Sequence, residues 1–140
     1  MDKTSETREQ QWSLNLSPFR GEPSKDYVIS SESQLVELVD ELIKQREGCG
    51  FLKNAEACLL FGVEGDKAIC HYYLISGKGG YLWAISSDKR VDTYIEFNIS
   101  GTSTEIPMHR CIPIDVMVEI VRYFYQTGKR LEDVKWEADE

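Results

Sequence analysis

The sequence predicts an α+β fold, with a mostly antiparallel sheet of five to six strands and two helices packed on one face of it. Two observations favour this class. Two stretches of the chain repeat apolar residues at helical spacing, and between them short apolar or alternating segments are separated by glycine-rich or charged turns. Short strands joined by tight turns pair antiparallel, and two amphipathic helices suffice to cover one face of such a sheet.

The length and composition fit one domain. The chain has 140 residues, of which 41% are hydrophobic, and this is enough for a single core. We expect a disordered segment over residues 1–11, one α+β domain over 12–136 and a loose acidic tail over 137–140. No apolar run approaches a membrane span and the N-terminal segment is polar, so we expect no membrane association, no secretory signal and a cytoplasmic location.

The net charge of −8 restricts the possible partners. An acidic surface repels phosphate backbones, so direct binding to nucleic acid is not expected. The same surface speeds the encounter with a basic protein. The charge alone is equally compatible with a role in solubility.

The N-terminal part predicts two short strands and a helix. Alternating apolar residues predict a strand over 12–16, and a second brief strand is expected over 27–29. A helix is expected over 31–46, because its apolar residues recur at helical spacing and Ser31 and Gln34 have the spacing of a capping box.

The helix over 31–46 is expected to end at Gly48 and Gly50. Four strand candidates then follow in meander order, over residues 57–63, 68–75, 81–86 and 91–98. The last alternates most clearly, with one apolar face (Val91, Thr93, Ile95 and Phe97) and one polar face (Asp92, Tyr94, Glu96 and Asn98). Such alternation is typical of an antiparallel sheet that is covered on one side only.

The C-terminal part predicts a short strand over 104–107, a helix over 114–127 and a last strand over 134–136. The second helix is the more apolar of the two and should be the more buried. Gly128 is the expected C-terminal cap of this helix.

Catalytic and metal-binding patterns are not found. The four cysteines form no C-x-x-C pair, and the His-x-Glu and Cys-x-x-Cys of zinc deaminases are missing. Cys70 adjoins His71, but neighbours on a strand point to opposite faces. The glycine-rich segment over 77–80 lacks the spacing of a phosphate-binding loop. We therefore expect no enzymatic activity, no metal and no cofactor.

An exposed patch on neighbouring strands is the more informative feature. Tyr94 and Glu96 lie on the polar face of their strand, and Tyr72, Tyr81 or Trp83 would lie beside them in one register. An aromatic patch ringed by carboxylates would result, of the kind enriched at protein interfaces. In the alternative register Tyr81 and Trp83 face the core and only Tyr94 is exposed, and the sequence does not decide between the two.

The last third of the chain resembles a known family. It combines Glu105-Ile106-Pro107, a helix with a Phe-Tyr end, the segment Thr127-Gly128-Lys129-Arg130 and the pattern Val134-x-Trp136. Over roughly residues 80–136 this order is similar to an immunity-protein family of bacterial polymorphic toxin systems, whose members neutralise deaminase and other toxin domains. Leu131 stands where a proline is often expected, and the N-terminal half matches no family pattern.

The resemblance implies an immunity protein that binds a cognate, basic toxin domain as a monomer in a 1:1 complex and covers its active site or substrate groove. The toxin contacts that we expect are Asp92, Tyr94, Glu96, Asn98, Tyr81, Trp83, Lys78 and Asp88. The motif residues Glu105, Pro107, Thr127, Gly128 and Trp136 are interpreted as architectural. Two alternatives stay open, a small-molecule-binding or enzymatic domain that uses the concave sheet face, and an adaptor for an unrelated protein.

Overall fold

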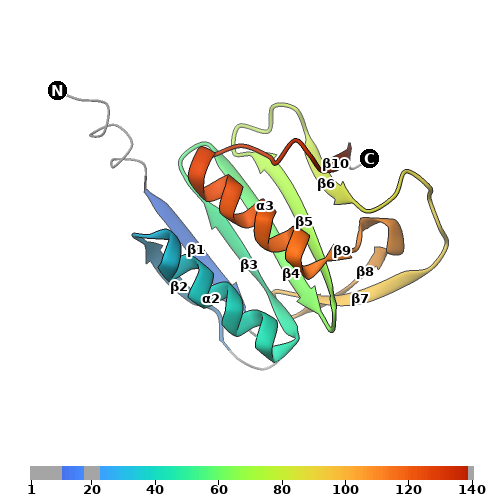
Figure 1. Cartoon of the computed structure of the whole chain (residues 1–140), viewed down its shortest axis with the longest axis horizontal. Helices are drawn as coiled ribbons and strands as arrows, with labels where there is room; N and C mark the ends of the chain where they lie inside the picture. The colour runs from blue at the N-terminus through green and yellow to red at the C-terminus, as the bar shows by residue number, and fades with distance from the viewer. Residues whose placement is uncertain (1–10, 18–22, 139–140) are drawn as a thin grey trace.

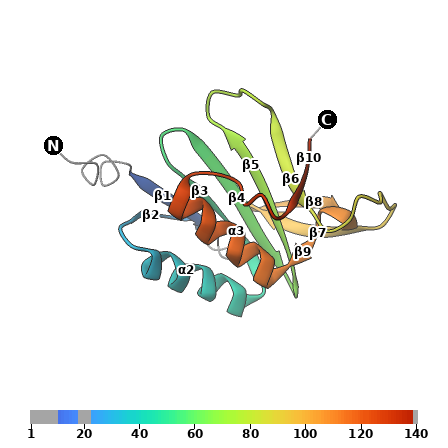
Figure 2. The same cartoon turned by 45° about the horizontal axis from the view of Figure 1, so that its top comes forward.

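The chain folds into an antiparallel sheet with two helices on one face and a separate β-hairpin on the other (Figures 1 and 2). The computed structural model describes residues 11–17 and 23–138. The main sheet has eight strands: β1 Trp12–Ser17, β2 Lys25–Ile29, β3 Glu47–Lys53, β4 Ala57–Glu64, β5 Lys67–Leu74, β6 Tyr81–Ile85, β9 Ile112–Pro113 and β10 Lys135–Ala138.

Seven of these strands follow the order β10-β6-β5-β4-β3-β1-β2, and β9 pairs with β5. All of these pairings are antiparallel. The predicted α+β class is therefore confirmed, with about eight strands in place of five to six. Strand β10 includes Glu137 and Ala138, so the last strand extends past the boundary expected at Trp136.

Helix α2 (Glu32–Gln45) begins as predicted and ends differently. Its N-terminus is capped by Ser31, whose Oγ accepts a hydrogen bond of 3.1 Å from the Gln34 amide. It ends at Arg46, which adopts the left-handed conformation with φ of 62°. The expectation that Gly48 and Gly50 end the helix is wrong, because both lie in β3, a strand that the sequence analysis missed.

Gly50 has a packing reason to be glycine. A Cβ atom there would lie 2.6 Å from Cζ of Phe61, a fully buried ring on the neighbouring strand β4. Glycine is depleted in strands because it contributes no packing and costs backbone entropy. The two glycines among its seven residues therefore made β3 difficult to predict from the sequence. One of them, Gly50, is required by the close approach of the β3 backbone to Phe61.

Helix α3 (Ile114–Thr127) agrees with its predicted range. It ends at Gly128, which has φ of 77° and donates its amide to the Phe124 carbonyl, as the predicted glycine cap requires. The buried face of α3 packs with α2 over the sheet and forms the main core. Within this core the rings of Trp12 and Phe124 meet edge to face at 5.1 Å.

The expected fourth strand of the meander belongs to a different sheet. Strand β7 (Tyr94–Ile99) begins three residues later than predicted and pairs with β8 (Thr102–Pro107), not with β6. The two-residue loop Ser100–Gly101 has φ values of 52° and 86°. Positive φ at both positions matches a type I′ hairpin turn.

This β7–β8 hairpin packs on the sheet face opposite the helices (Figure 2). Phe97 and Ile106 from the hairpin meet Ile69, Trp83 and Cys111 in a second, smaller core. The hairpin covers only part of this face, and we call the uncovered part the open face. It carries residues of β1 to β6 that alternate with those of the main core.

Candidate functional site

The outward side of the β7–β8 hairpin is acidic. Because Phe97 and Ile106 point to the sheet, the alternate positions Tyr94, Glu96 and Glu105 point away from it. All three are exposed, and Tyr94 is 54% accessible. Glu96 lies directly opposite Glu105 in the register, and neither forms an ion pair with another described residue.

A cross-strand pair of like charges costs stability. The Glu96–Glu105 pair lies on the outward side of the hairpin, where neither side chain packs against the core. The pair is therefore a local conflict between charge and stability of the kind found at functional surfaces.

Two further predicted contacts, Asp92 and Asn98, differ in their exposure to solvent. Asp92 is exposed in the segment that precedes β7. Asn98 is only 7% accessible and donates a 3.2 Å hydrogen bond to Glu47 Oε2, so the expectation that it shares the exposed face is wrong. At this end the hairpin lies against β3, where the Ser100 amide donates to Cys49 Sγ.

Tyr81 and Trp83 match neither of the two expected registers. Both project onto the face opposite the helices, but Tyr81 is 46% accessible whereas Trp83 is buried in the second core. The hairpin and the 3-10 turn η1 (Met108–Arg110) account for the difference. They cover Trp83, and the Arg110 guanidinium lies 5.2 Å from its ring centre. Neither residue lies beside Tyr94 in a sheet, because β6 and β7 belong to different sheets.

Tyr81 instead joins a row of rings on the open face. His71 stacks on Tyr81 at 5.5 Å and contacts Trp83 at 4.2 Å, and Tyr73 lies 4.8 Å from Tyr81. The row runs across β5 and β6 and continues toward a hollow. These rings form an aromatic cluster of the kind expected from the sequence, but the cluster lies on β5 and β6 and not beside Tyr94.

The hollow on the open face has a volume of about 330 Å³. It is lined by Ser13, Asn15, Asp26, Phe51, Lys53, Cys58, Tyr73 and Ile75. Its volume is at the lower end of that of small-molecule pockets. The open face is therefore hollowed on one side and aromatic on the other.

The thiols on either face of the sheet are not activated nucleophiles. Burial raises the pKa of Cys58, and it also raises that of Cys70. A hydrogen bond with Cys58 and burial together raise the pKa of Tyr73 to about 12. Cys70 belongs to the main core, while the adjacent His71 lies in the aromatic row on the other face. The two cannot form a nucleophile–base pair.

Lys78 and Asp88 lie apart from the acidic hairpin side. Lys78 lines a second hollow of about 280 Å³ with Lys129 and Arg130, next to residues that face the helices. Asp88 accepts a hydrogen bond of 2.8 Å from the Lys135 ammonium. The structure therefore places only Tyr94 and Glu96 of the predicted contacts on the outward side of the hairpin, with Asp92 in the exposed segment that precedes β7.

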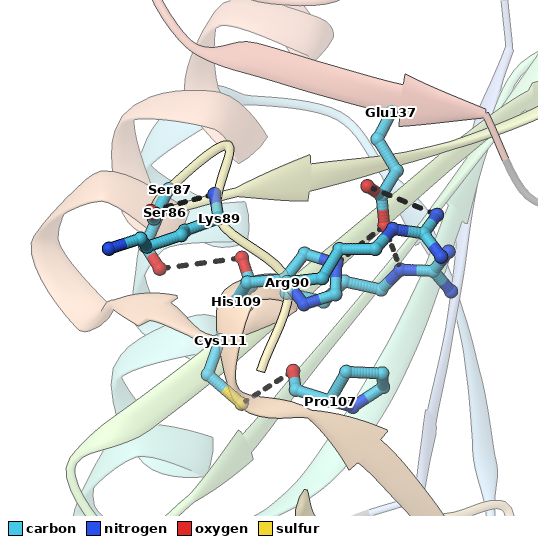
Figure 3. A network of polar contacts seen from close by, with 9 residues as sticks. Ser86, Ser87, Lys89, Arg90, Pro107, His109, Cys111 and Glu137 are labelled. Carbon is cyan, nitrogen blue, oxygen red and sulfur yellow. Dashed lines mark hydrogen bonds and ion pairs between the residues drawn. The ribbon is translucent and has the colours of Figure 1, made fainter. Parts of the chain in front are cut away.

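A polar network fixes the base of the hairpin (Figure 3). Glu137 of β10 meets His109 Nε2 at 2.8 Å and accepts a hydrogen bond of 2.6 Å from Arg110 Nε, and Arg90 lies 3.8 Å away. Burial acts to raise the pKa of Glu137, but the hydrogen bonds from Arg110 and His109 outweigh it, and the pKa is lowered. The last strand is thus tied to η1, which follows β8 directly.

Glu105 and the β3 residues of the open face were not among the predicted toxin contacts. Glu105 was interpreted as architectural, although the hairpin register was accessible from the Ser100–Gly101 turn signal. A two-residue loop at these positions places Glu96 opposite Glu105. Phe51 and Lys53 were missed because the glycines of β3 masked the strand.

Two general properties bear on the type of site. Among the residues that the structure describes, no group of three or more His, Cys, Asp or Glu side chains is placed to hold a metal ion. No helix in the same part of the chain is long and apolar enough to cross a membrane.

The fold and these surfaces define an α+β domain that presents an acidic hairpin and an open aromatic sheet face. Residues 24–138 match the family described as immunity protein Imm1, and the chain belongs to this family. The predicted resemblance is confirmed, and the match extends back to residue 24, into the N-terminal half in which no family pattern was found. No curated protein matches the chain. Membership indicates a non-enzymatic role in toxin neutralisation, with a cognate toxin protein as the partner.

Proposed function

We propose that this immunity protein neutralises a nucleic-acid-targeting toxin, such as a deaminase, in the bacterial cytoplasm. It binds the toxin domain 1:1 and covers its active site or substrate groove. An enzyme that acts on nucleic acid presents a basic groove, because phosphate contacts dominate its affinity for substrate. An acidic protein surface in that groove excludes the substrate without any chemistry of its own.

The observation that carries this proposal is the outward pair Glu96 and Glu105. A lysine or arginine of the toxin that is placed between the two carboxylates relieves their repulsion and gains a charge-assisted contact. Tyr94 and Asp92 extend the same surface. Lys78, Asp88 and Tyr81 are proposed as peripheral contacts, whereas Trp83 and Asn98 support the surface from within.

Affinity purification from the native bacterium tests this proposal, with the tagged wild-type chain as bait. The double reversal Glu96→Lys with Glu105→Lys should fail to recover the toxin domain that the wild type recovers. The matched control is Glu37→Lys with Glu41→Lys, which makes the same charge change on the exposed side of α2. The control should behave as the wild type.

The recovered toxin domain then allows a test of function. Its expression should stop growth, and co-expression of the wild-type chain should restore growth. Growth arrest that the wild type does not relieve refutes neutralisation. Rescue by both double variants leaves neutralisation intact but removes the hairpin from the interface.

A further inference from the structure

The sheet face opposite the helices carries two neighbouring cross-strand rows, and the hairpin and η1 cover the Trp83 end of the first. One row runs through Asp26, Asn15, Phe51, Leu60, His71, Trp83 and Glu137, and the next runs through Val28, Ser13, Lys53, Cys58, Tyr73 and Tyr81. A sheet face exposed to water normally carries polar side chains. Here aromatic and aliphatic side chains are interspersed with polar ones in both rows.

Exposed apolar side chains gather on this face. The large hydrophobic residues that are exposed in the described part of the chain are Val28, Ile75, Tyr81, Val91 and Tyr94. Three of them, Val28, Ile75 and Tyr81, lie on the open face, and the half-buried Phe51 and Tyr73 lie between them. A contiguous apolar patch with a polar rim marks an interaction site.

The shape and charge of this face indicate what it binds. The hollow forms where the small side chains Ser13 and Cys58 lie between the larger Phe51, Tyr73 and Ile75. Lys53 stands at its rim, is exposed and forms no ion pair with the other described residues. The lining also holds the Asp26 carboxylate, which accepts a hydrogen bond from the Asn15 amide at 2.9 Å. An exposed lysine without an ion pair therefore borders a hollow of mixed polar and apolar lining, in a chain of net charge −8.

We propose that the open face is the apolar centre of the toxin interface, and that its hollow receives an aromatic or aliphatic side chain of the toxin next to a toxin carboxylate that pairs with Lys53. This inference rests on the proposed function. Buried aromatic anchors in a pocket dominate binding energy, whereas charged rims set the association rate and orientation. A toxin surface that is basic opposite the hairpin and carries a carboxylate opposite Lys53 matches both surfaces in one docking orientation.

The hairpin and the open face are able to meet one partner surface. The hairpin lies on the same side of the sheet as the open face, and Tyr94, Glu96 and Glu105 point away from the sheet. The hairpin covers Trp83 on β6, and the hollow lies across β1 to β5 on the same face of the sheet. The residues of both surfaces point away from the helices.

The test uses the full chain and the toxin domain recovered with the wild type, in a titration that measures dissociation constants. Lys53→Glu should weaken binding at least about tenfold, and Ile75→Ala with Tyr81→Ala should do the same. Lys44→Glu, the same change on the exposed side of α2, should have no effect. Urea unfolding of each variant identifies any loss that reflects misfolding, and for such a variant Tyr81→Ser or Lys53→Gln replaces it.

The possible outcomes separate the two proposals. If folded Lys53 and Ile75/Tyr81 variants bind like the wild type while Glu96→Lys with Glu105→Lys does not, the open face is not the centre and the inference is overturned. If the wild type recovers no toxin domain from the native bacterium, or does not bind the purified domain in the titration, the proposed function fails as well. If native mass spectrometry of the purified chain finds a small molecule that the Ser13→Phe variant loses, the hollow is a ligand pocket and the inference is likewise overturned.

Discussion

Removal of one of the two opposed glutamates on the hairpin should make the protein more stable and a poorer inhibitor. Glu96 and Glu105 are paired directly in the β7–β8 register and are both exposed. Side chains at such positions are separated by about 5 Å at Cβ. Two unit charges at that distance in water repel by about 0.8 kcal/mol.

Screening reduces this repulsion. With a Debye length of about 8 Å at physiological ionic strength, the repulsion falls to about 0.4 kcal/mol, which is within the range measured for cross-strand pairs. Glu105→Gln and Glu96→Gln should therefore each raise the free energy of unfolding by about 0.4 kcal/mol. Because either change ends the repulsion, the double variant should gain little more than a single one.

The assay is urea unfolding at low salt and at about 1 M salt, where the Debye length is only about 3 Å. The stability gain should vanish at high salt, while the affinity for the toxin domain should fall in both single variants. Glu119→Gln, on the exposed side of α3, controls for the change in net charge. A loss of stability in Glu105→Gln, or a gain that does not depend on salt, would refute the argument.

Three further perturbations test the architecture that carries the surface. Gly50→Ala should destabilise the protein by about 1–3 kcal/mol, because its methyl group meets the buried Phe61 ring. In urea unfolding, the double variant Gly50→Ala with Phe61→Leu should lose less stability than the sum of the two single variants. A double variant whose loss equals that sum would contradict the clash. Glu137→Gln should cost about 1–3 kcal/mol at neutral pH because a charged, part-buried hydrogen bond is lost. Since the folded pKa of Glu137 is lowered from 4.5, its contribution is present above pH 4.5 and is lost as the pH falls through the folded pKa, so the variant should show a shallower acid loss of stability than the wild type. Trp136→Ala should cost about 2 kcal/mol, below the range for a fully buried tryptophan, because Trp136 is only half-buried and its indole donates to the Leu131 carbonyl; a thermal midpoint equal to that of the wild type would show that Trp136 does not close the core.

Elements with local signals were predictable from the sequence. Helix α3 agreed over its whole predicted range, and the cap at Gly128 and the capping contact of Ser31 were both confirmed. Each of these features depends only on residues within a few positions along the chain, so the local sequence is sufficient to predict it. The same holds for the tight β4–β5 turn, in which Gly65 has φ of 65°.

The errors arose where distant contacts decide the outcome. Strand β3 contains Gly50 because of Phe61 on the neighbouring strand, and no local pattern reports that contact. Strand β7 alternates as a strand should, but the alternation does not say whether its partner is β6 or β8. Asn98 was assigned to the exposed face because alternation continues to the end of β7. Its burial comes from Glu47 on another strand, which the sequence pattern does not place.

Along β7 and β8, residues that pack in the second core alternate with residues that face the solvent. The inward residues Phe97 and Ile106 are both buried in the second core, so their substitution costs stability. The outward residues Tyr94, Glu96 and Glu105 contact solvent, so their substitution changes charge and shape at little cost in packing. A chain with this arrangement is able to adopt a new toxin specificity through its outward positions while the sheet, the helices and the Glu137 network stay unchanged. Under the proposed function, the opposed glutamates are the outward residues for which a cost in stability is offset by binding, which makes them the hairpin positions that we expect to set specificity.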